Sequence, residues 1–239
     1  MECGMLKALA VVILSVLTQL RPLLEVAGIG PFAAVAAGMV PAEINGATGF
    51  FVNTDGDFVS AAHVLDHCPQ PFLVTPGGIR LGRVVAVSKE FDTAVARFDW
   101  APQQAAVFPD YQPQLLWEPV TITRYHRCGG PASLSLIEAR AVGVVRGWSG
   151  RIALLAASPI QGGNSGSPIL DPQGAVVGML VARDVEETRN GFAISTDALQ
   201  TFLRSAGIRI ETEGRRLPFL FDSKSGAAIA YTYPVGCIL

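Results

Sequence analysis

Short apolar runs that alternate with turn-forming residues dominate the sequence from residue 47 onward. Residues 47–53 are largely apolar, and an Asp-Gly turn separates them from a second short run at residues 58–60. An Asp-Gly pair between two such runs is a strong indication of a β-hairpin. The same arrangement recurs at residues 72–75 and 79–88, with a Pro-Gly-Gly turn between them. The pattern therefore predicts an all-β domain made of short strands.

The second half of the chain repeats this pattern after a connection at residues 101–119, which is rich in Pro and Gln and lacks periodicity. Thr196-Asp197 predicts the start of a helix at residues 198–205. The tail beyond it shows no motif, and its apolar residues favour packing on the rest of the protein. Further strands are predicted at residues 120–125, 133–146, 151–158, 175–182 and 191–195.

The first 40 residues read as a targeting segment. Lys7 precedes an apolar run at residues 8–17, which suits a signal peptide better than a full membrane span. A small-x-small sequence at residues 34–36 resembles a cleavage site but lies far from that run. An uncleaved signal anchor, with attachment to a membrane, is therefore an alternative, and a buried N-terminal helix of a cytosolic domain is a third. The first two predict export, to a periplasmic, secreted or membrane-anchored location.

Composition and charge narrow the classes of function. The 239 residues carry a net charge of −2, so the chain has no basic field that would hold nucleic acid. The four cysteines include no C-x-x-C pair, so nothing indicates a zinc site or another cofactor. A disulfide between Cys68 and Cys128 would tie the two halves together, while unpaired thiols are an equally good interpretation.

A glycine-rich stretch at residues 161–170 carries the first candidate chemistry. Ser165 lies between Gly163 and Gly166, and glycine permits backbone conformations that bring peptide N–H groups close to a substrate. Two such N–H groups can bind a developing oxyanion, and the serine beside them can act as a nucleophile. Alone, the same string is as often an ordinary turn.

Two further polar residues stand at the ends of predicted strands. His63 follows a run of small residues, and Asp92 precedes the apolar run at residues 93–98. A bare carboxylate in that position is costly unless a partner accepts its charge, so Asp92 either caps the strand or orients an imidazole. His67 and His126 are competing bases, but neither follows a small-residue strand end.

His63, Asp92 and Ser165 occur in one of the known chain orders of a catalytic triad. A serine hydroxyl is a poor nucleophile near neutral pH, and an imidazole can take its proton and later deliver it to the leaving group. A carboxylate fixes the imidazole tautomer and stabilises the imidazolium. The three residue types together indicate acyl transfer.

The sequence resembles the Deg/Htr-type branch of the chymotrypsin-like serine proteases over roughly residues 43–205. The resemblance implies two six-stranded antiparallel β-barrels, at residues 41–119 and 120–206, with a C-terminal helix, a tail at 207–239 and the site in the cleft between the barrels. It implies His63 as the base, Asp92 as the orienting group and Ser165 as the nucleophile, with the N–H groups of Gly163 and Ser165 as the oxyanion hole. The segments that carry it are 47–53, 60–64, 92–95, 129–131, 142–145, 163–168 and 191–194.

Three departures from that family stand out. Ser167 occupies a position where the family usually has glycine, and serine is small enough to keep activity. Asn164 replaces the aspartate with which digestive members clamp a freed N-terminus, which argues against cleavage of a zymogen as the switch. We expect no peptide-binding PDZ module after the helix, so the regulation and the trimer known in the family do not carry over.

The expected substrate is a polypeptide. The wall of the S1 pocket is expected from Ile160 before the serine and from Ala193, Ile194 and Ser195, and none of these is charged. A pocket without a carboxylate favours small or medium apolar P1 residues over Lys or Arg. The alternative is a catalytically idle protease fold that serves as a binding or scaffold protein. The oligomeric state has no signal in the sequence.

Overall fold

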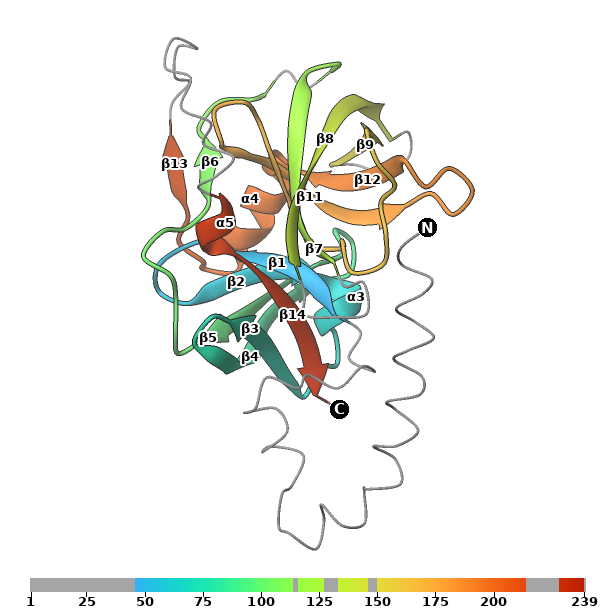
Figure 1. Ribbon diagram of the computed structural model, residues 1–239. Coiled ribbons are helices and arrows are strands. Elements are labelled where there is room, and N and C mark those ends of the chain that lie inside the picture. Colours follow the sequence, from blue (N-terminus) through green and yellow to red (C-terminus); the bar gives the residue numbers. More distant parts are fainter. Residues whose placement is uncertain (1–45, 114–115, 127–132, 146–149, 214–227, 239) are drawn as a thin grey trace, which may run out of the picture.

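Two closed six-stranded β-barrels make up most of the protein (Figure 1). The computed structural model describes residues 46–113, 116–126, 133–145, 150–213 and 228–238. Neighbouring strands within each barrel run antiparallel. The fold class predicted from the sequence, all-β with two antiparallel barrels and a helix after the second, is confirmed. The predicted targeting segment at residues 1–40 lies outside the described residues.

Barrel one surrounds an aromatic core. The hairpin of β1 and β2 forms where the Asp-Gly turn predicted it, with Gly56 at a φ of 97°. Phe58 packs edge-on against Phe51 and Phe98, at ring-centroid distances of 5.0 and 5.7 Å. The strands of this barrel are β1 (Ala47–Phe51), β2 (Asp57–Ala61), β3 (Gln70–Thr75), β4 (Gly78–Ser88), β5 (Thr93–Phe98) and β14 (Thr232–Ile238).

The sixth strand of barrel one comes from the predicted tail, which corrects the expected boundaries. Strand β14 pairs with β1 on one side and with β3 on the other, and so closes the barrel. The first barrel is therefore not confined to residues 41–119, and part of residues 207–239 belongs to it. Pro234 and Gly236 obscured this strand, because both residue types are rare in the interior of a sheet.

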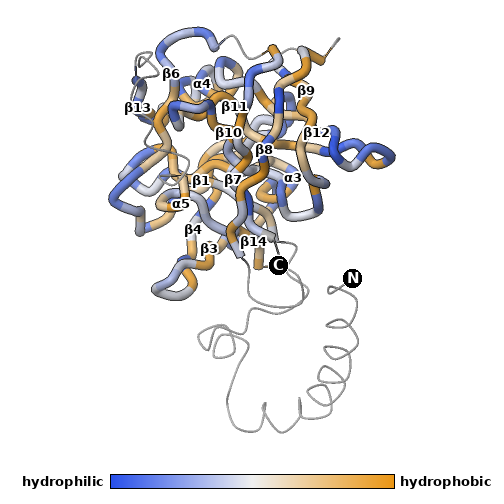
Figure 2. The backbone as a smooth tube through the Cα atoms, turned by 45° about the horizontal axis from the view of Figure 1, so that its top comes forward, coloured by the Kyte–Doolittle hydropathy of each residue, from blue (hydrophilic) through white to orange (hydrophobic). Residues whose placement is uncertain are grey.

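Barrel two follows the predicted strands closely and has an aliphatic core that includes Ile122, Leu154 and Ile169. Its hairpin between β11 and β12 projects from the barrel as a hydrophilic loop (Figure 2). The strands are β7 (Pro119–His126), β8 (Ser133–Val144), β9 (Arg151–Ala156), β10 (Pro168–Leu170), β11 (Val176–Arg183) and β12 (Asn190–Ser195).

Two smaller features complete the fold. Strand β6 (Val107–Pro109), within the connection predicted to lack structure, pairs in parallel with β13 (Glu211–Glu213). Helix α4 (Thr196–Ser205) begins one residue after Ser195, whose Oγ accepts a hydrogen bond from the Ala198 N–H at 3.4 Å. Ser195 is thus the N-cap, not the predicted Thr196-Asp197. Within the part of the chain that the structure describes, no helix is long and apolar enough to span a membrane.

One disulfide joins Cys68, shortly after β2, to Cys237 in β14. The predicted pairing of Cys68 with Cys128 is therefore wrong, and Cys128 lies outside the described residues. The pairing of β14 with β3 explains the observed bridge, because Cys237 lies opposite Pro71, three residues after Cys68. The bridge fastens the closing strand of barrel one to the segment that follows His63.

Replacing both bridge cysteines (Cys68→Ser with Cys237→Ser) should lower the free energy of unfolding by about 2–5 kcal/mol, because the bridge closes a long loop and restricts the unfolded chain. The two residues are 169 positions apart. Urea unfolding of both proteins, with and without a reductant, measures the effect. Reductant should destabilise the wild type and leave the double variant unchanged. Equal stability of the two oxidised proteins would contradict the assignment.

Candidate active site

His63 lies at the junction of β2 and a one-turn helix, α3 (Ala62–Leu65). Its Nδ1 is 2.8 Å from Asp92 Oδ2, and its backbone N–H donates to Asp92 Oδ1 at 2.9 Å. The Ala62 N–H donates to the Asp92 carbonyl oxygen at 2.9 Å. The imidazole is half exposed. Asp92 thus makes two contacts with His63 and one with Ala62, and these contacts fix both the backbone and the ring of His63.

Asp92 combines the two roles that the sequence left open. It stands just before β5 with a φ of 49°, a left-handed conformation that aspartate tolerates better than most residues. One carboxylate oxygen accepts a backbone N–H, as in a strand cap, while the other faces the ring of His63. With the ring proton on Nδ1, the Nε2 atom of His63 is left as a base.

The carboxylate of Asp92 also sets the electrostatics of His63. Its hydrogen bond raises the pKa of His63 above the ordinary value for histidine, because the carboxylate stabilises the protonated ring. Partial burial acts in the opposite direction and is the weaker influence. Neutral His63, the form that can accept a proton, therefore becomes dominant only at a higher pH than for an isolated ring.

Two consecutive tight turns, which share Asn164, form the loop of Ser165, and Ser165 is the second residue of the second turn. In the first, the Asn164 N–H donates to the Gln161 carbonyl at 3.2 Å, and Gly163 has a φ of 90°. In the second, the Ser167 N–H donates to the Asn164 carbonyl at 3.1 Å, and Gly166 has a φ of 83°. Both turns thus have the glycine at their third position that a type II turn requires.

The two turns leave the N–H groups of Gly163 and Ser165 without an acceptor among the described residues, whereas those of Asn164, Gly166 and Ser167 all donate to carbonyl groups. The two free donors flank Asn164 on the same loop. They are the groups that the sequence predicted as an oxyanion hole, and the arrangement leaves both available to an external oxygen.

Thr48 of β1 holds this loop against barrel one. Its N–H donates to the Ser165 carbonyl at 3.0 Å, and its hydroxyl donates to the Gly163 carbonyl at 2.9 Å. Ser60, three residues before His63, donates to the Thr48 carbonyl at 2.7 Å. A Cβ at Gly166 would lie 2.0 Å from that carbonyl oxygen, so only glycine fits there. These contacts bring the serine loop to the end of β2, where His63 lies.

No hydrogen bond joins the Ser165 hydroxyl to the His63 ring within the described parts of the chain. Such bonds are often long in proteins without substrate and shorten when it binds. No group of three or more His, Cys, Asp or Glu residues in those same parts is placed to bind a metal ion. The groups that this site offers for chemistry are the hydroxyl, the imidazole, the carboxylate and the peptide N–H groups.

The predicted substrate-binding residues are largely buried. Ile160, Ala193 and Ile194 belong to the hydrophobic core, and Ser195 caps α4. Ile160 lies over Gly191, because a Cβ at that glycine would be 2.5 Å from Ile160 Cδ1.

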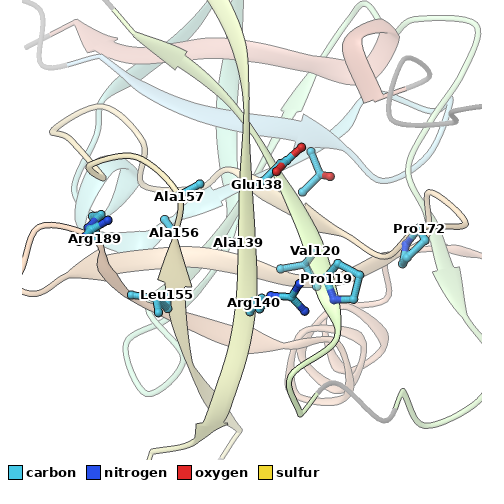
Figure 3. Close-up of a pocket in the computed structure, with 11 residues that line it drawn as sticks. Pro119, Val120, Glu138, Ala139, Arg140, Leu155, Ala156, Ala157, Pro172 and Arg189 are labelled. Atoms are coloured by element: carbon cyan, nitrogen blue, oxygen red, sulfur yellow. The ribbon is translucent and has the colours of Figure 1, made fainter.

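A shallow cavity of about 610 Å³ opens on barrel two, and it contains none of the three residues predicted to form a triad. Arg189 and Pro172 lie at opposite ends of it in Figure 3.

Sequence reasoning missed the residues that support the loop. Arg124 of β7 donates from Nη1 to Asn164 Oδ1 at 2.8 Å, and no motif in the sequence pointed to it. Thr48 appeared only as a member of an apolar segment. The substitution at Asn164 was the one available signal, since a buried side chain at that position needs a partner.

Comparison with known proteins matches residues 47–179 to the family described as trypsin-like peptidase domain. An uncharacterized protein of Sinorhizobium fredii, y4bJ, is 27% identical in an alignment of 205 positions that covers 77% of this chain. The alignment covers 32% of that relative, so the chain spans about a third of the relative's length.

Similar folds occur among solved structures. The active form of the Rv3671c protease from M. tuberculosis aligns with a TM-score of 0.58 and 19% identity, covering 70% of this chain and 76% of that one. A serine endoprotease from Yersinia pestis aligns with a TM-score of 0.56 and 19% identity, covering 67% and 57% respectively. At these identities the likeness concerns the fold.

Replacing Asp92 by asparagine (Asp92→Asn) should lower the pKa of His63, because the amide cannot stabilise the imidazolium as the carboxylate does. NMR titration of the imidazole measures this directly. Asp66→Asn is a matched control, since Asp66 contacts Lys89 and His67 instead of His63. An unchanged midpoint for His63 in the Asp92 variant would refute the role of Asp92.

Proposed function

Because the chain belongs to the trypsin-like peptidase domain family, we propose that it is a serine endopeptidase that uses His63, Asp92 and Ser165 as its triad. The observation that carries the proposal is the 2.8 Å contact between His63 Nδ1 and Asp92 Oδ2. It supplies an oriented base at the strand end against which the loop of Ser165 is held. The free N–H groups of Gly163 and Ser165 add the electrostatic component that acyl transfer requires.

The proposed reaction follows from these positions. Ser165 Oγ attacks the carbonyl carbon of the scissile peptide while His63 Nε2 takes the hydroxyl proton. The resulting oxyanion receives hydrogen bonds from the N–H groups of Gly163 and Ser165. Collapse of this intermediate breaks the C–N bond, and His63 delivers its proton to the leaving amine. Water then attacks the acyl-enzyme by the same steps, releases the acid and restores Ser165.

Substrate choice follows from the absence of charge around the proposed S1 site. Ile160, Ala193, Ile194 and Ser195 are uncharged, so nothing there would pair with a Lys or Arg side chain. Ile160 also lies close to Gly191, where its side chain would limit the depth of the S1 site. Both features favour cleavage after small or medium apolar residues such as Ala or Val.

An idle protease fold that acts as a binding or scaffold protein is the second candidate. The observation in its favour is the missing hydrogen bond between Ser165 and His63 in the described residues. The geometry of Asp92 argues against it, because this residue has a left-handed backbone conformation and contacts His63 with both carboxylate oxygens. A binding protein has no chemical need for an imidazole oriented in this way.

The proposed place of action is outside the cytoplasm. The apolar run at residues 8–17 and the Cys68–Cys237 disulfide both favour an oxidising compartment. Fusing residues 1–45 to a reporter that works only after export should give signal, and the same fusion with charged residues in the apolar run should not. Absence of reporter activity from both fusions, with both proteins recovered from the cytosol, would refute export.

Ser165→Ala and His63→Ala should each abolish turnover of an Ala- or Val-containing peptide, and the double variant should be little worse, because the two residues act as one unit. The measurements are steady-state hydrolysis and labelling by a fluorophosphonate, with an Arg-containing peptide as the comparison substrate. Wild-type activity should fall as pH drops through the pKa of His63, since the protonated ring cannot accept the serine proton.

Ser167→Ala is the matched control, since Ser167 lies on the same loop, is fully buried and has no assigned role in the reaction. Retention of more than a few per cent of turnover by Ser165→Ala would contradict the assignment, as would a lack of labelling in the wild type. Faster cleavage of the Arg peptide would overturn the proposed substrate preference alone.

A further inference from the structure

Arg124 is a buried cation directly behind the serine loop. Its side chain projects from β7 and the residue is only 9% exposed. Nε donates to Ser135 Oγ at 3.1 Å, and Nη1 donates to the Pro159 carbonyl at 3.2 Å and to Asn164 Oδ1 at 2.8 Å. The guanidinium thus connects β8, the segment that enters the loop and the residue just before Ser165.

No carboxylate pairs with Arg124 among the described residues, which is unusual for a guanidinium at this depth. Burial lowers its pKa below the ordinary value for arginine, because desolvation disfavours the charged form. All the acceptors it contacts are neutral oxygens, and two of the three belong to residues 159–164. Burying an unpaired charge costs free energy, and two of the three acceptors of this charge lie in one segment. The arrangement therefore indicates that Arg124 has a role in the serine loop.

Asn164 transmits the contact to the turn that presents Gly163. The side chain is fully buried, and its Oδ1 accepts hydrogen bonds from Arg124 Nη1 and from the Gln161 N–H at 2.7 Å. The Asn164 N–H returns a bond to the Gln161 carbonyl. Both ends of the turn are therefore clamped, and the orientation of the peptide between Gly162 and Gly163 is fixed with them.

We propose that Arg124, through Asn164, is the positioning residue that holds the N–H of Gly163 in place to bind the oxyanion. The inference rests on the proposed function of the same site. It accounts for a formed oxyanion loop in a chain that has no aspartate at position 164, since an internal guanidinium and a neutral amide hold the turn. Arg124 itself touches no reacting atom.

The first test compares Arg124→Met with Arg97→Met. Both remove a guanidinium from a barrel strand, but Arg97 pairs with Asp57 at 2.7 Å in barrel one and has no contact with the serine loop. We expect Arg124→Met to lower kcat by about a hundredfold, the effect of losing one oxyanion donor, with KM little changed. Arg97→Met should lower the melting temperature and leave kcat unchanged when assayed well below that temperature.

The second test uses substitutions that keep the contact. Arg124→Lys should recover part of the lost kcat, because an ammonium retains donors but not the planar fork. Asn164→Asp should remain active beside Arg124, since its carboxylate can pair with the guanidinium. In the Arg124→Met background the same Asn164→Asp change should remove the remaining activity, because the buried carboxylate then has no partner. Arg124→Lys and the single Asn164→Asp variant serve the test even if Arg124→Met does not fold: a kcat unchanged by Arg124→Lys would overturn the proposal.

The outcomes distinguish a failure of the proposed function from a failure of the proposal about Arg124. A wild type that neither cleaves peptide nor reacts with a fluorophosphonate would overturn the proposed function, and the inference with it. An active wild type whose kcat survives Arg124→Met would overturn the inference alone. An equal fall of kcat in Arg97→Met would show general destabilisation and would also overturn it. A selective fall in kcat, with non-additive effects of Arg124→Met and Asn164→Asp, would support it.

Discussion

The site depends on the hydrogen bonds of Thr48, which join the two barrels to the serine loop. This buried residue of β1 bonds the carbonyl groups of Gly163 and Ser165, and its hydroxyl also accepts the Tyr125 N–H of β7 at 2.9 Å. Its own carbonyl accepts the Ser60 hydroxyl. One residue thus connects the barrel that carries the proposed base, the barrel that carries the proposed nucleophile and the loop between them. A shift of one barrel against the other would break several of these bonds at once, so the relative placement of base and nucleophile is a property of the junction.

The sequence was informative wherever a signal was local. Alternating apolar runs with Asp-Gly and Pro-Gly-Gly turns predicted the hairpins, because turn chemistry depends on neighbouring residues. The pairing of His63 with Asp92 could be anticipated, since a carboxylate at the start of an apolar strand needs a partner. Glycines at 163 and 166 likewise predicted the two turns around Ser165, where the structure shows positive φ angles.

Contacts between segments that lie far apart in the chain could not be predicted from the sequence. Strand β14 was hidden because Pro234 lies in its interior. The opposite residue, Thr48, needs no N–H from that proline, because its carbonyl accepts the Ser60 hydroxyl and its own N–H donates to the serine loop. The pairing of β14 with β3 is what places Cys237 beside Cys68, so the disulfide could not be predicted without this strand. Arg124 and Asn164 are 40 positions apart and leave no mark in either segment alone. That Ser195, and not Thr196, caps α4 depends on one side-chain hydrogen bond.

The position of β14 along the chain also determines when the site can exist during biosynthesis. Barrel one receives its last strand after the whole of barrel two, so a nascent chain that has emerged as far as Ser165 already holds every residue of the proposed triad but has no closed first barrel. Until β14 emerges, β1 and β3 keep open edges, and the segment after His63 lacks its disulfide partner. The order of the strands therefore delays completion of the site until nearly all of the described sequence has left the ribosome.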